Sequence, residues 1–401
     1  MFVAIVEFIM RKVLFICSSF PWPPTDGERL RSFNFIRELS ASSAITVAHP
    51  GPKVLPQELL DALPKNVTWH RYEKQTINLL EKIFCALTLT PIFYRAANAD
   101  KMQVWLSSKN KNEFDVVHLD GLPAFNYYDR ALSITNNIVM DLRDSWSMLY
   151  ERLYRTGGQS PIKFFKKILV TRIEKRLVKR CKKLVMISDV DTRHLYKIYG
   201  DDRTPIRVIP NGVSKEFLAV PFIASKKEYP TVAFTGAMDY APNVQAATYF
   251  AKEVMPILTQ QHQNLKFFIV GKNPTDEVLK LANDSIIVTG GVPSVANYLK
   301  DIDIVVAPLL SGAGMKNKVL EALAASRPMV ASQVAVEGID IVPERDFLLA
   351  GTIVEWVAHL DRLIQYPEMA SKLAKSGHTQ IQKKYSWSTA AESFLNLYEE
   401  D

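Results

Sequence analysis

The chain has 401 residues, of which 48% are hydrophobic and 23% charged, a composition typical of a soluble globular protein. This length exceeds one typical hydrophobic core and predicts two domains. No apolar run approaches the roughly 20 residues that span a bilayer. The three cysteines lack metal-ligand spacing, which predicts no zinc site and favours a reducing compartment, the cytoplasm.

The first nine residues, MFVAIVEFI, precede the first predicted strand. They lack the basic region and the cleavage site of a secretory signal. Two interpretations stay open, an upstream extension of the reading frame and a small hydrophobic anchor.

Short apolar segments alternate with helical segments along the first half of the chain. Strands are predicted at residues 12–17, 44–48, 67–71, 116–119, 138–141, 184–187 and 207–209. Apolar strands separated by helices are typical of a parallel sheet covered on both faces. Ligands bind beyond the carboxyl ends of such strands, so the loops at those ends are candidate sites.

The loop after the first strand, SSFPWPPTDGERLR, places Gly27 close to the start of a helix. Neither a GxGxxG fingerprint nor a P-loop occurs in the sequence, which argues against a hydride-transfer enzyme. The alternative for this loop is a rigid surface turn stiffened by its prolines.

Polar residues end the fourth and fifth predicted strands of this half. In HLDGLP, His118 and Asp120 point to one side of the strand, and either can accept a proton from a hydroxyl nucleophile. Asp120, further into the loop, is the better candidate base, and a core histidine is the alternative for His118. In DLRDSW, Asp141, Arg143 and Asp144 can bind a polar acceptor or pair with one another.

Positive charge is concentrated between residues 151 and 183, where twelve Lys or Arg residues accompany two Glu residues. Apolar residues recur there every three or four positions, which predicts an amphipathic helix with one strongly basic side. They are Ile162, Phe165, Leu169, Ile173, Leu177, Cys181 and Leu184. Two interpretations remain, a helix that lies on anionic lipid and a core-facing helix with a basic solvent side.

The alternation restarts after Pro230, with strands predicted at residues 231–234, 266–270, 286–288, 303–307 and 329–331. The loops after these strands are expected to line one edge of a second sheet. Three of them carry glycines and other candidate contacts, namely Gly236, Gly271, Lys272, Gly290, Gly291 and Val292.

The fourth loop of this half, SGAGMKNK, leads into a helix predicted at residues 317–325. It supplies two glycines, which permit close backbone approach, and two lysines at a helix N-terminus: Gly312, Gly314, Lys316 and Lys318. Glu321 lies one turn further on, on the same side as Lys318. A carboxylate suits sugar hydroxyls, so the pattern indicates a sugar-phosphate ligand. The alternative is a Gly-rich turn with a solvated Lys–Glu pair.

Eight segments follow one another in a specific order: SSFPWPPTDGERLR, DVVHLDG, LVMISDV, VIPNGV, FTGAMDYAPN, IVGKNP, GMKNKVLEALAASRPMVAS with its trailing EGI, and YSWSTAAESFLNLY. In that order they resemble the retaining, nucleotide-sugar-dependent glycosyltransferases of group 1 (family 4-like), particularly those that build bacterial surface polysaccharides. The resemblance spans nearly the whole chain. It implies the α/β GT-B fold, two Rossmann-like doubly wound domains that face each other across a cleft. An acceptor-binding domain at 1–212 and a donor-binding domain at 213–384 are implied, with 385–401 packing back on the first.

The resemblance also assigns roles to single residues. Glu321 would hold the ribose hydroxyls, Gly236 would approach the diphosphate, and Val292 would lie where the backbone contacts the base. Gly27 falls in the loop that closes over the donor phosphates, and Asp120 falls beside the reacting centre.

The remaining expectations complete this site. Asp120 and Lys318 are the expected catalytic residues, and the expected acceptor contacts are His118, Arg143 and Asp144. Further donor contacts are expected at Gly271, Lys272, Gly314, Met315, Lys316, Lys318 and Val319. The leaving diphosphate itself helps to take the acceptor proton in this family, so no protein nucleophile is implied. No metal is implied either, because lysines and helix N-termini are expected to hold the diphosphate. Neither a cofactor nor a nucleic acid partner is expected.

Three departures from the family pattern matter. The position eight before Glu321 is Ala313, where the family has a carboxylate that contacts the sugar, so the donor sugar stays open. The loop MDYAPN lacks the usual Arg and Lys, so Lys318 and Lys316, with Lys272 as a weaker candidate, are expected to balance the diphosphate charge. Ser214 follows PNGV where an acid is common, which concerns the linker.

The leading hypothesis is therefore a cytoplasmic glycosyltransferase, free or peripheral at the inner membrane face, that acts on a glycan or a lipid-linked acceptor. Two alternatives stay open. One is a nucleotide-sugar epimerase of the same fold, and the other is a non-catalytic nucleotide-sugar-binding or scaffold protein with a degraded site.

Overall fold

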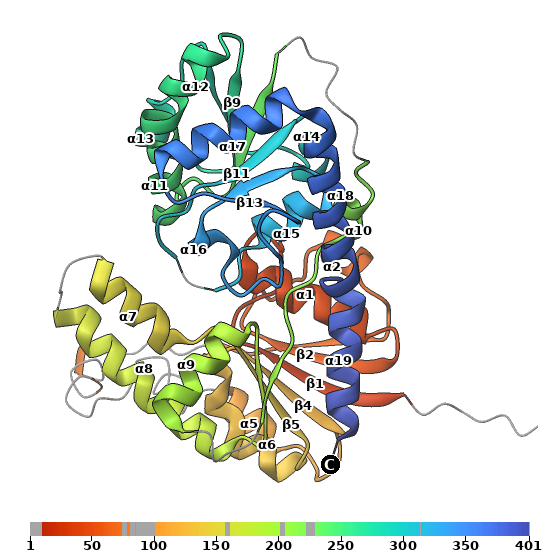
Figure 1. The fold of residues 1–401 in the computed structure, drawn as a ribbon. Helices are drawn as coiled ribbons and strands as arrows, with labels where there is room; N and C mark the ends of the chain where they lie inside the picture. The colour runs from red at the N-terminus through yellow and green to blue at the C-terminus, as the bar shows by residue number, and fades with distance from the viewer. Residues whose placement is uncertain are drawn as a thin grey trace, which may run out of the picture. The chain divides into compact units, whose positions relative to one another are not determined.

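The computed structural model describes residues 10–73, 78–80, 85, 101–156, 161–200, 205–221, 229–312 and 314–400. The chain divides into two compact units: unit 1 comprises Met1–Pro210 and Trp387–Asp401, and unit 2 comprises Asn211–Ser386. Figure 1 shows a parallel sheet flanked by helices in each unit. The N-terminal segment MFVAIVEFI and Ala313 lie outside the described residues.

The sheet of unit 1 has the strand order β3-β2-β1-β4-β5-β6-β7, and neighbouring strands are parallel. The strands are β1 (Arg11–Cys17), β2 (Ser43–His49), β3 (Val67–Arg71), β4 (Val116–Asp120), β5 (Ile138–Arg143), β6 (Lys183–Met186) and β7 (Ile206–Val208). The order reverses between β1 and β4. Ligands bind at such a reversal in open α/β sheets because the loops diverge there.

Alternation along the strands creates two cores in unit 1. In β1, Val13 and Phe15 belong to one core, and Leu14 and Ile16 belong to the other. The first core includes side chains of α1 (Gly27–Leu39), α2 (Gln57–Asp61) and α19 (Trp387–Glu399). The second core includes side chains of α5 (Lys101–Ser107), η1 (Leu122–Tyr127), α6 (Tyr128–Ile134), α8 (Pro161–Arg180) and α9 (Asp189–Tyr199). The C-terminal helix α19 thus belongs to unit 1.

The basic segment forms parts of two helices rather than one, α7 (Trp146–Thr156) and α8, which lie side by side (Figure 1). The predicted apolar stripe is buried at Ile173, Leu177 and Cys181. Phe165, which the stripe assigned to the same buried side, is 53% exposed. The core-facing interpretation therefore holds for the later turns of α8 and not for Phe165, because the core ends before the first two turns.

The sheet of unit 2 has the order β10-β9-β8-β11-β12-β13, again with parallel neighbours. Its strands are β8 (Thr231–Thr235), β9 (Lys266–Val270), β10 (Ile286–Gly290), β11 (Ile304–Ala307), β12 (Met329–Ala331) and β13 (Leu348–Leu349). The order reverses between β8 and β11. The sequence missed β13 because two residues are too short to show an alternating pattern.

The helices of unit 2 are α10 (Lys215–Leu218), α11 (Ala241–Tyr249), the π-helical η2 (Phe250–Val254), α12 (Met255–Gln261), α13 (Asp276–Leu279), α14 (Val295–Leu299), α15 (Asn317–Ala324), α16 (Gln333–Val336), α17 (Ile353–Gln365) and α18 (Pro367–Lys384). They pack with the sheet around one hydrophobic core. The predicted class, two Rossmann-like α/β domains, is confirmed. No helix in the described part of the chain is both long enough and apolar enough to span a membrane.

Candidate nucleotide-sugar site

The loops after β8 and β11 meet at the strand reversal of unit 2. Gly236 directly follows β8, and a Cβ atom placed on it would lie 2.7 Å from Asn243 Nδ2 and 2.7 Å from Lys318 Nζ. Asn243 of α11 and Lys318 of α15 therefore both lie against Gly236. Two of them, Gly236 and Lys318, are candidates from the sequence.

The loop after β9 packs against the backbone of Gly236. A Cβ atom on Gly271 would lie 1.6 Å from the carbonyl oxygen of Gly236, so only glycine permits the observed backbone approach. The Gly236 N–H donates to the Val270 carbonyl at 2.9 Å, and the Gly271 N–H donates to the Gly290 carbonyl at 3.0 Å. These bonds fix the three glycine loops to one another.

Lys318 supplies the positive charge. Its Nζ donates to Asn243 Oδ1 at 2.5 Å and lies 4.4 Å from the centre of the Phe234 ring. An ammonium group has three N–H donors, and Asn243 Oδ1 is its one hydrogen-bond acceptor among the described residues. Burial lowers the pKa of Lys318 to about 7, against the opposing effect of Glu321. An anion beside Lys318 would use the remaining donors and restore the charge.

Asn243 was not predicted. Its Nδ2 donates to the Ala237 carbonyl at 2.8 Å, which turns its Oδ1 toward Lys318. Asn243 is the last residue of MDYAPN, and as a neutral amide it shows no charge by which its contact with a distant lysine could be predicted. A polar residue in the first turn of the helix after a strand-end glycine is the signal that was present.

Lys316, two residues before Lys318, makes a hydrogen bond within its own loop. Lys316 Nζ donates to the Gly314 carbonyl, and a Cβ atom on Gly312 would lie 3.3 Å from Lys316 Cε. The loop thus wraps around the Lys316 side chain. Burial raises the pKa of Glu321 to about 7, and nearby Lys318 opposes this shift.

The other donor candidates differ in exposure. Lys272 is exposed, whereas Val292 and Met315 are partly buried against the core. Val319 is 0% exposed, and its N–H donates to the Lys316 carbonyl at 2.9 Å. Neither the buried side chain nor the hydrogen-bonded N–H of Val319 is available to a nucleotide-sugar. We therefore do not retain Val319 as a contact. Gly314 has a φ of 69°, which favours glycine.

In unit 1, Arg143 is the last residue of β5 and is held by two carboxylates. Its Nε donates to Asp120 Oδ1 at 2.9 Å, and its Nη1 lies 3.1 Å from Glu28 Oε1. Glu28 is the second residue of α1, next to Gly27. Arg143 has a φ of 70° and follows a register shift in β5. An arginine in this left-handed conformation costs energy, which is common at functional positions.

Asp120 was predicted to lie in the loop. It is instead the last residue of β4 and is 1% exposed. Its second oxygen accepts a hydrogen bond from Ser32 Oγ at 2.5 Å. Burial raises the pKa of Asp120, and Arg143 opposes this shift. Both oxygens are engaged, so this geometry favours a positioning role toward Arg143 over direct proton transfer.

His118 belongs to the core of unit 1. It is 0% exposed, its Nδ1 lies 2.7 Å from the Tyr398 hydroxyl, and its ring stacks on Phe15 at 4.2 Å. Burial lowers the pKa of His118 to about 3, so the ring is neutral at physiological pH. These contacts fit the core alternative, and we do not retain His118 as an acceptor contact. Asp144 is partly buried.

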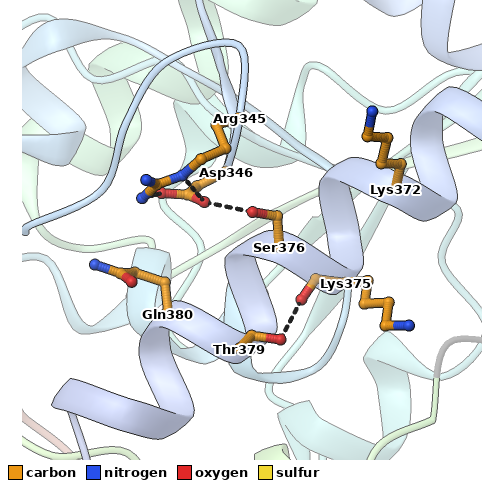
Figure 2. Close-up of a pocket in the computed structure, with 7 residues that line it drawn as sticks. All are labelled: Arg345, Asp346, Lys372, Lys375, Ser376, Thr379 and Gln380. Atoms are coloured by element: carbon orange, nitrogen blue, oxygen red, sulfur yellow. Dashed lines mark hydrogen bonds and ion pairs between the residues drawn. The ribbon is translucent and has the colours of Figure 1, made fainter.

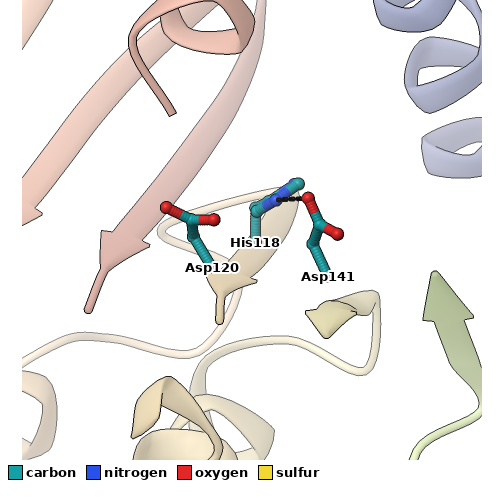
Figure 3. A group of neighbouring side chains, drawn as sticks. All are labelled: His118, Asp120 and Asp141. Atoms are coloured by element: carbon teal, nitrogen blue, oxygen red, sulfur yellow. Dashed lines mark ion pairs between the residues drawn. The ribbon is translucent and has the colours of Figure 1, made fainter. Parts of the chain in front are cut away.

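Asp141 pairs with neither Arg143 nor Asp144 but with Arg31 of α1, whose Nε lies 2.8 Å from Asp141 Oδ2. Figure 3 shows Asp141 beside His118 and Asp120, whose potential ligand atoms lie within 4.8 Å of one another. A metal ion would have to displace the guanidinium groups of Arg31 and Arg143 from these carboxylates. The three residues therefore fit an ion-pair network better than a metal site.

The N-terminus of α7, just after Arg143, is held by the buried acid Glu174. Glu174 of α8 is 0% exposed, and its Oε1 accepts from the Ser147 N–H at 3.2 Å, at the N-terminus of α7. Burial raises the pKa of Glu174 from 4.5 to about 7. Between these pH values the folded protein retains a proton that the unfolded chain has released.

The free energy of unfolding should therefore decrease as the pH rises through this window. Glu174→Gln removes the effect, so the variant should gain about 2 kcal/mol relative to the wild type between pH 5 and pH 8. Urea denaturation at both pH values measures this difference. Exposed Glu253→Gln is the control, and an equal response of the two variants would contradict the assignment.

One pocket, of about 350 Å³, lies elsewhere on unit 2 (Figure 2). It is lined by Arg345, Asp346, Lys372, Lys375, Ser376, Thr379 and Gln380. Asp346 pairs with Arg345 at 2.7 Å and accepts from Ser376 at 2.7 Å. None of the predicted site residues lines it, and its charged groups are already partly paired.

Comparisons with known proteins agree with this fold. Residues 229–366 match the family model described as glycosyl transferases group 1, and residues 89–217 match the model described as glycosyltransferase family 4. The two matches do not overlap and together cover more than half of the chain. A search of curated proteins found no significant match.

Solved structures resemble this chain over nearly its full length. Sucrose-phosphate synthase from Thermosynechococcus elongatus is 13% identical, with a TM-score of 0.71 over 97% of this chain and 98% of that one. TarM of S. aureus is 12% identical, with a TM-score of 0.69 over 98% and 100%. HepE of Anabaena, solved with UDP-glucose, is 12% identical, with a TM-score of 0.66 over 96% and 98%. Identities this low show the fold alone. Together with the two family models, they establish that the chain belongs to the group 1 glycosyltransferases and has the GT-B fold.

Proposed function

We propose that this glycosyltransferase moves a sugar from a nucleotide diphosphate donor to a glycan or lipid-linked acceptor in cell-surface polysaccharide synthesis, with retention of anomeric configuration. The observation that carries the donor assignment is the contact of Gly236, Asn243 and Lys318 at the strand reversal of unit 2. A cation with spare donors beside a glycine backbone suits a diphosphate.

In this proposal the diphosphate lies against Gly236 and Lys318, and the N-terminus of α15 adds its partial positive charge. Glu321, one turn further along α15, accepts from the ribose hydroxyls. The exposed Lys272, on a neighbouring loop, is a weaker candidate for the diphosphate, and the backbone near Val292 is the proposed contact with the base. A protein that can balance the diphosphate charge in this way needs no metal, and the proposal includes no cofactor.

The reaction breaks the bond between the sugar C1 atom and the diphosphate oxygen and forms a bond between C1 and the acceptor oxygen. The acceptor proton passes to the leaving diphosphate. Arg143, held by Asp120 and Glu28, is the proposed acceptor contact of unit 1. Asp144, two residues before the start of α7, is a second candidate.

A thermal-shift panel of UDP-, GDP- and ADP-sugars tests the donor assignment, because a ligand that binds only the folded state raises its apparent stability. One nucleotide class should stabilise the wild type, and Glu321→Gln should weaken that stabilisation about tenfold in apparent affinity by loss of a charge-assisted hydrogen bond. Exposed Glu253→Gln is the control.

NMR analysis of the products formed from the nucleotide-sugar that stabilises the protein distinguishes a retaining transferase from an epimerase. A glycoside of unchanged anomeric configuration supports retaining transfer, whereas an inverted product contradicts it. A changed sugar nucleotide formed from donor alone indicates an epimerase. Absence of any affinity for nucleotides would contradict the assignment of the donor site and favour a non-catalytic protein.

A further inference from the structure

The solvent-facing side of α8 is aromatic at one end and basic along the rest. Six of its exposed residues are Phe164, Phe165, Arg172, Lys175, Arg176 and Lys179. At 100° per residue these positions share one side of the helix. The opposite side carries Val170, Ile173, Leu177 and Val178, which are buried in the core of unit 1.

This side presents no acid of its own. Helix α8 has eight Lys or Arg residues and one acid, Glu174, which is buried against the N-terminus of α7. Within the described part of the chain, Arg172, Lys175 and Lys179 form no ion pair. By contrast, Arg180 pairs with Asp129, and Lys167 lies 3.6 Å from Glu151. In that part of the chain, Arg172, Lys175 and Lys179 are thus not balanced by a paired carboxylate.

The aromatic end is equally distinctive. Phe164 is 46% exposed and Phe165 is 53% exposed, although they are neighbours in the sequence. Phe164 contacts Tyr154 of α7 at a ring distance of 5.8 Å, which anchors the pair to the α7–α8 hairpin seen in Figure 1. Exposed phenylalanines beside a row of cations are the composition of a helix that lies at a lipid–water interface.

We propose that α8 docks this protein on an anionic lipid bilayer. Phe164 and Phe165 enter the boundary between headgroups and acyl chains, and Arg172, Lys175 and Lys179 contact lipid phosphates and carboxylates. The helix lies along the surface rather than across it, because its inner side is committed to the core of unit 1. Charge complementarity selects anionic lipid as the partner.

This inference deepens the proposed function, because a lipid-linked acceptor would lie at the same surface, but its test does not use the transferase activity. Failure of lipid binding would leave the donor assignment intact. Failure of nucleotide binding would leave the lipid surface intact.

The test is co-sedimentation of the full chain with vesicles of phosphatidylcholine alone and of phosphatidylcholine mixed with phosphatidylserine. The wild type should bind the mixed vesicles, and added salt should weaken binding. The triple variant Arg172→Gln, Lys175→Gln, Lys179→Gln should bind about 100-fold more weakly, since each charge near such a surface contributes about fivefold. The double variant Phe164→Ala, Phe165→Ala should bind about tenfold more weakly.

A matched triple variant, Lys252→Gln, Lys280→Gln, Lys383→Gln, removes the same charge from exposed positions of unit 2 and should bind like the wild type. Circular dichroism of all variants checks that they are folded. In a second measurement, Phe165→Trp should show a blue-shifted emission with mixed vesicles only.

Three results would overturn the proposal: equal binding of the two triple variants, equal binding of the wild type to both kinds of vesicle, or an unshifted Phe165→Trp emission. A fourth is displacement from vesicles by duplex DNA that depends on the three cations and not on the phenylalanines. That result would identify a nucleic-acid surface instead.

Discussion

Replacing Lys318 with alanine is expected to lower kcat/KM for the nucleotide-sugar by about a thousandfold while leaving the protein folded. One unit charge at about 4 Å from a diphosphate contributes about 4 kcal/mol at an intermediate dielectric, which corresponds to three orders of magnitude. The loss should be this large because Lys318 is the cation that contacts Gly236, and the loop MDYAPN offers no other. Steady-state kinetics with the donor found in the thermal-shift panel measures it.

The same residue predicts a pH dependence. Burial lowers the pKa of Lys318 to about 7, and a bound diphosphate would raise it. Binding should therefore take up a proton above pH 7, and the affinity for the nucleotide should fall as the pH rises from 7 to 9. Calorimetry in buffers of different ionisation enthalpy measures this uptake, which should be absent in Lys318→Ala.

Lys280→Ala, which removes an exposed charge after α13, is the control and should retain both the turnover and the proton uptake. Wild-type turnover by Lys318→Ala would exclude the diphosphate role. Unchanged proton uptake in the same variant would assign that proton to another group.

Gly271→Ala is the second change with a large expected effect. Its Cβ atom would lie 1.6 Å from the Gly236 carbonyl oxygen and 2.7 Å from the Gly236 carbonyl carbon. Both are backbone atoms, which cannot rotate away as a side chain can. We expect a loss of about 3 kcal/mol or more in the stability of unit 2, together with loss of nucleotide binding, because the loop after β8 must move.

Gly291→Ala is a matched control. Its nearest contact outside its own chain neighbours would be Lys272 Cβ at 3.6 Å, an ordinary van der Waals distance. Denaturation of both variants, each with and without nucleotide, separates a local loop effect from general intolerance of alanine. A Gly271→Ala protein with wild-type stability and affinity would show that the approach of these loops is not required.

The alternation of strands and helices was predictable because it depends on local geometry. A strand shows a period of two and a helix a period of 3.6, and both periods are visible in short windows of sequence. Strands β3, β9 and β12 were predicted with their observed bounds. The glycines at strand ends were visible in the sequence, but the reason for Gly271, the close approach of the Gly236 backbone, was not.

The ion-pair partners of the charged residues in DLRDSW were not predictable from the sequence. The DLRDSW sequence suggested pairing among its own charges, yet Asp141 pairs with Arg31 and Arg143 pairs with Glu28 and Asp120. These partners come from α1 and β4, which lie beside the loop only because the order of strands in the sheet places β1 and β4 between β2 and β5.

The sequence by itself thus determined the elements, the Gly-rich loops and the family resemblance of this protein. Only the tertiary structure decided that Asn243 orients Lys318, that His118 is a core residue, and that Phe165 faces solvent. The physical reason is that periodicity and turns arise from neighbouring residues. Burial and the pairing of charges instead depend on which distant segments the sheet brings together, and the sequence does not record that order locally.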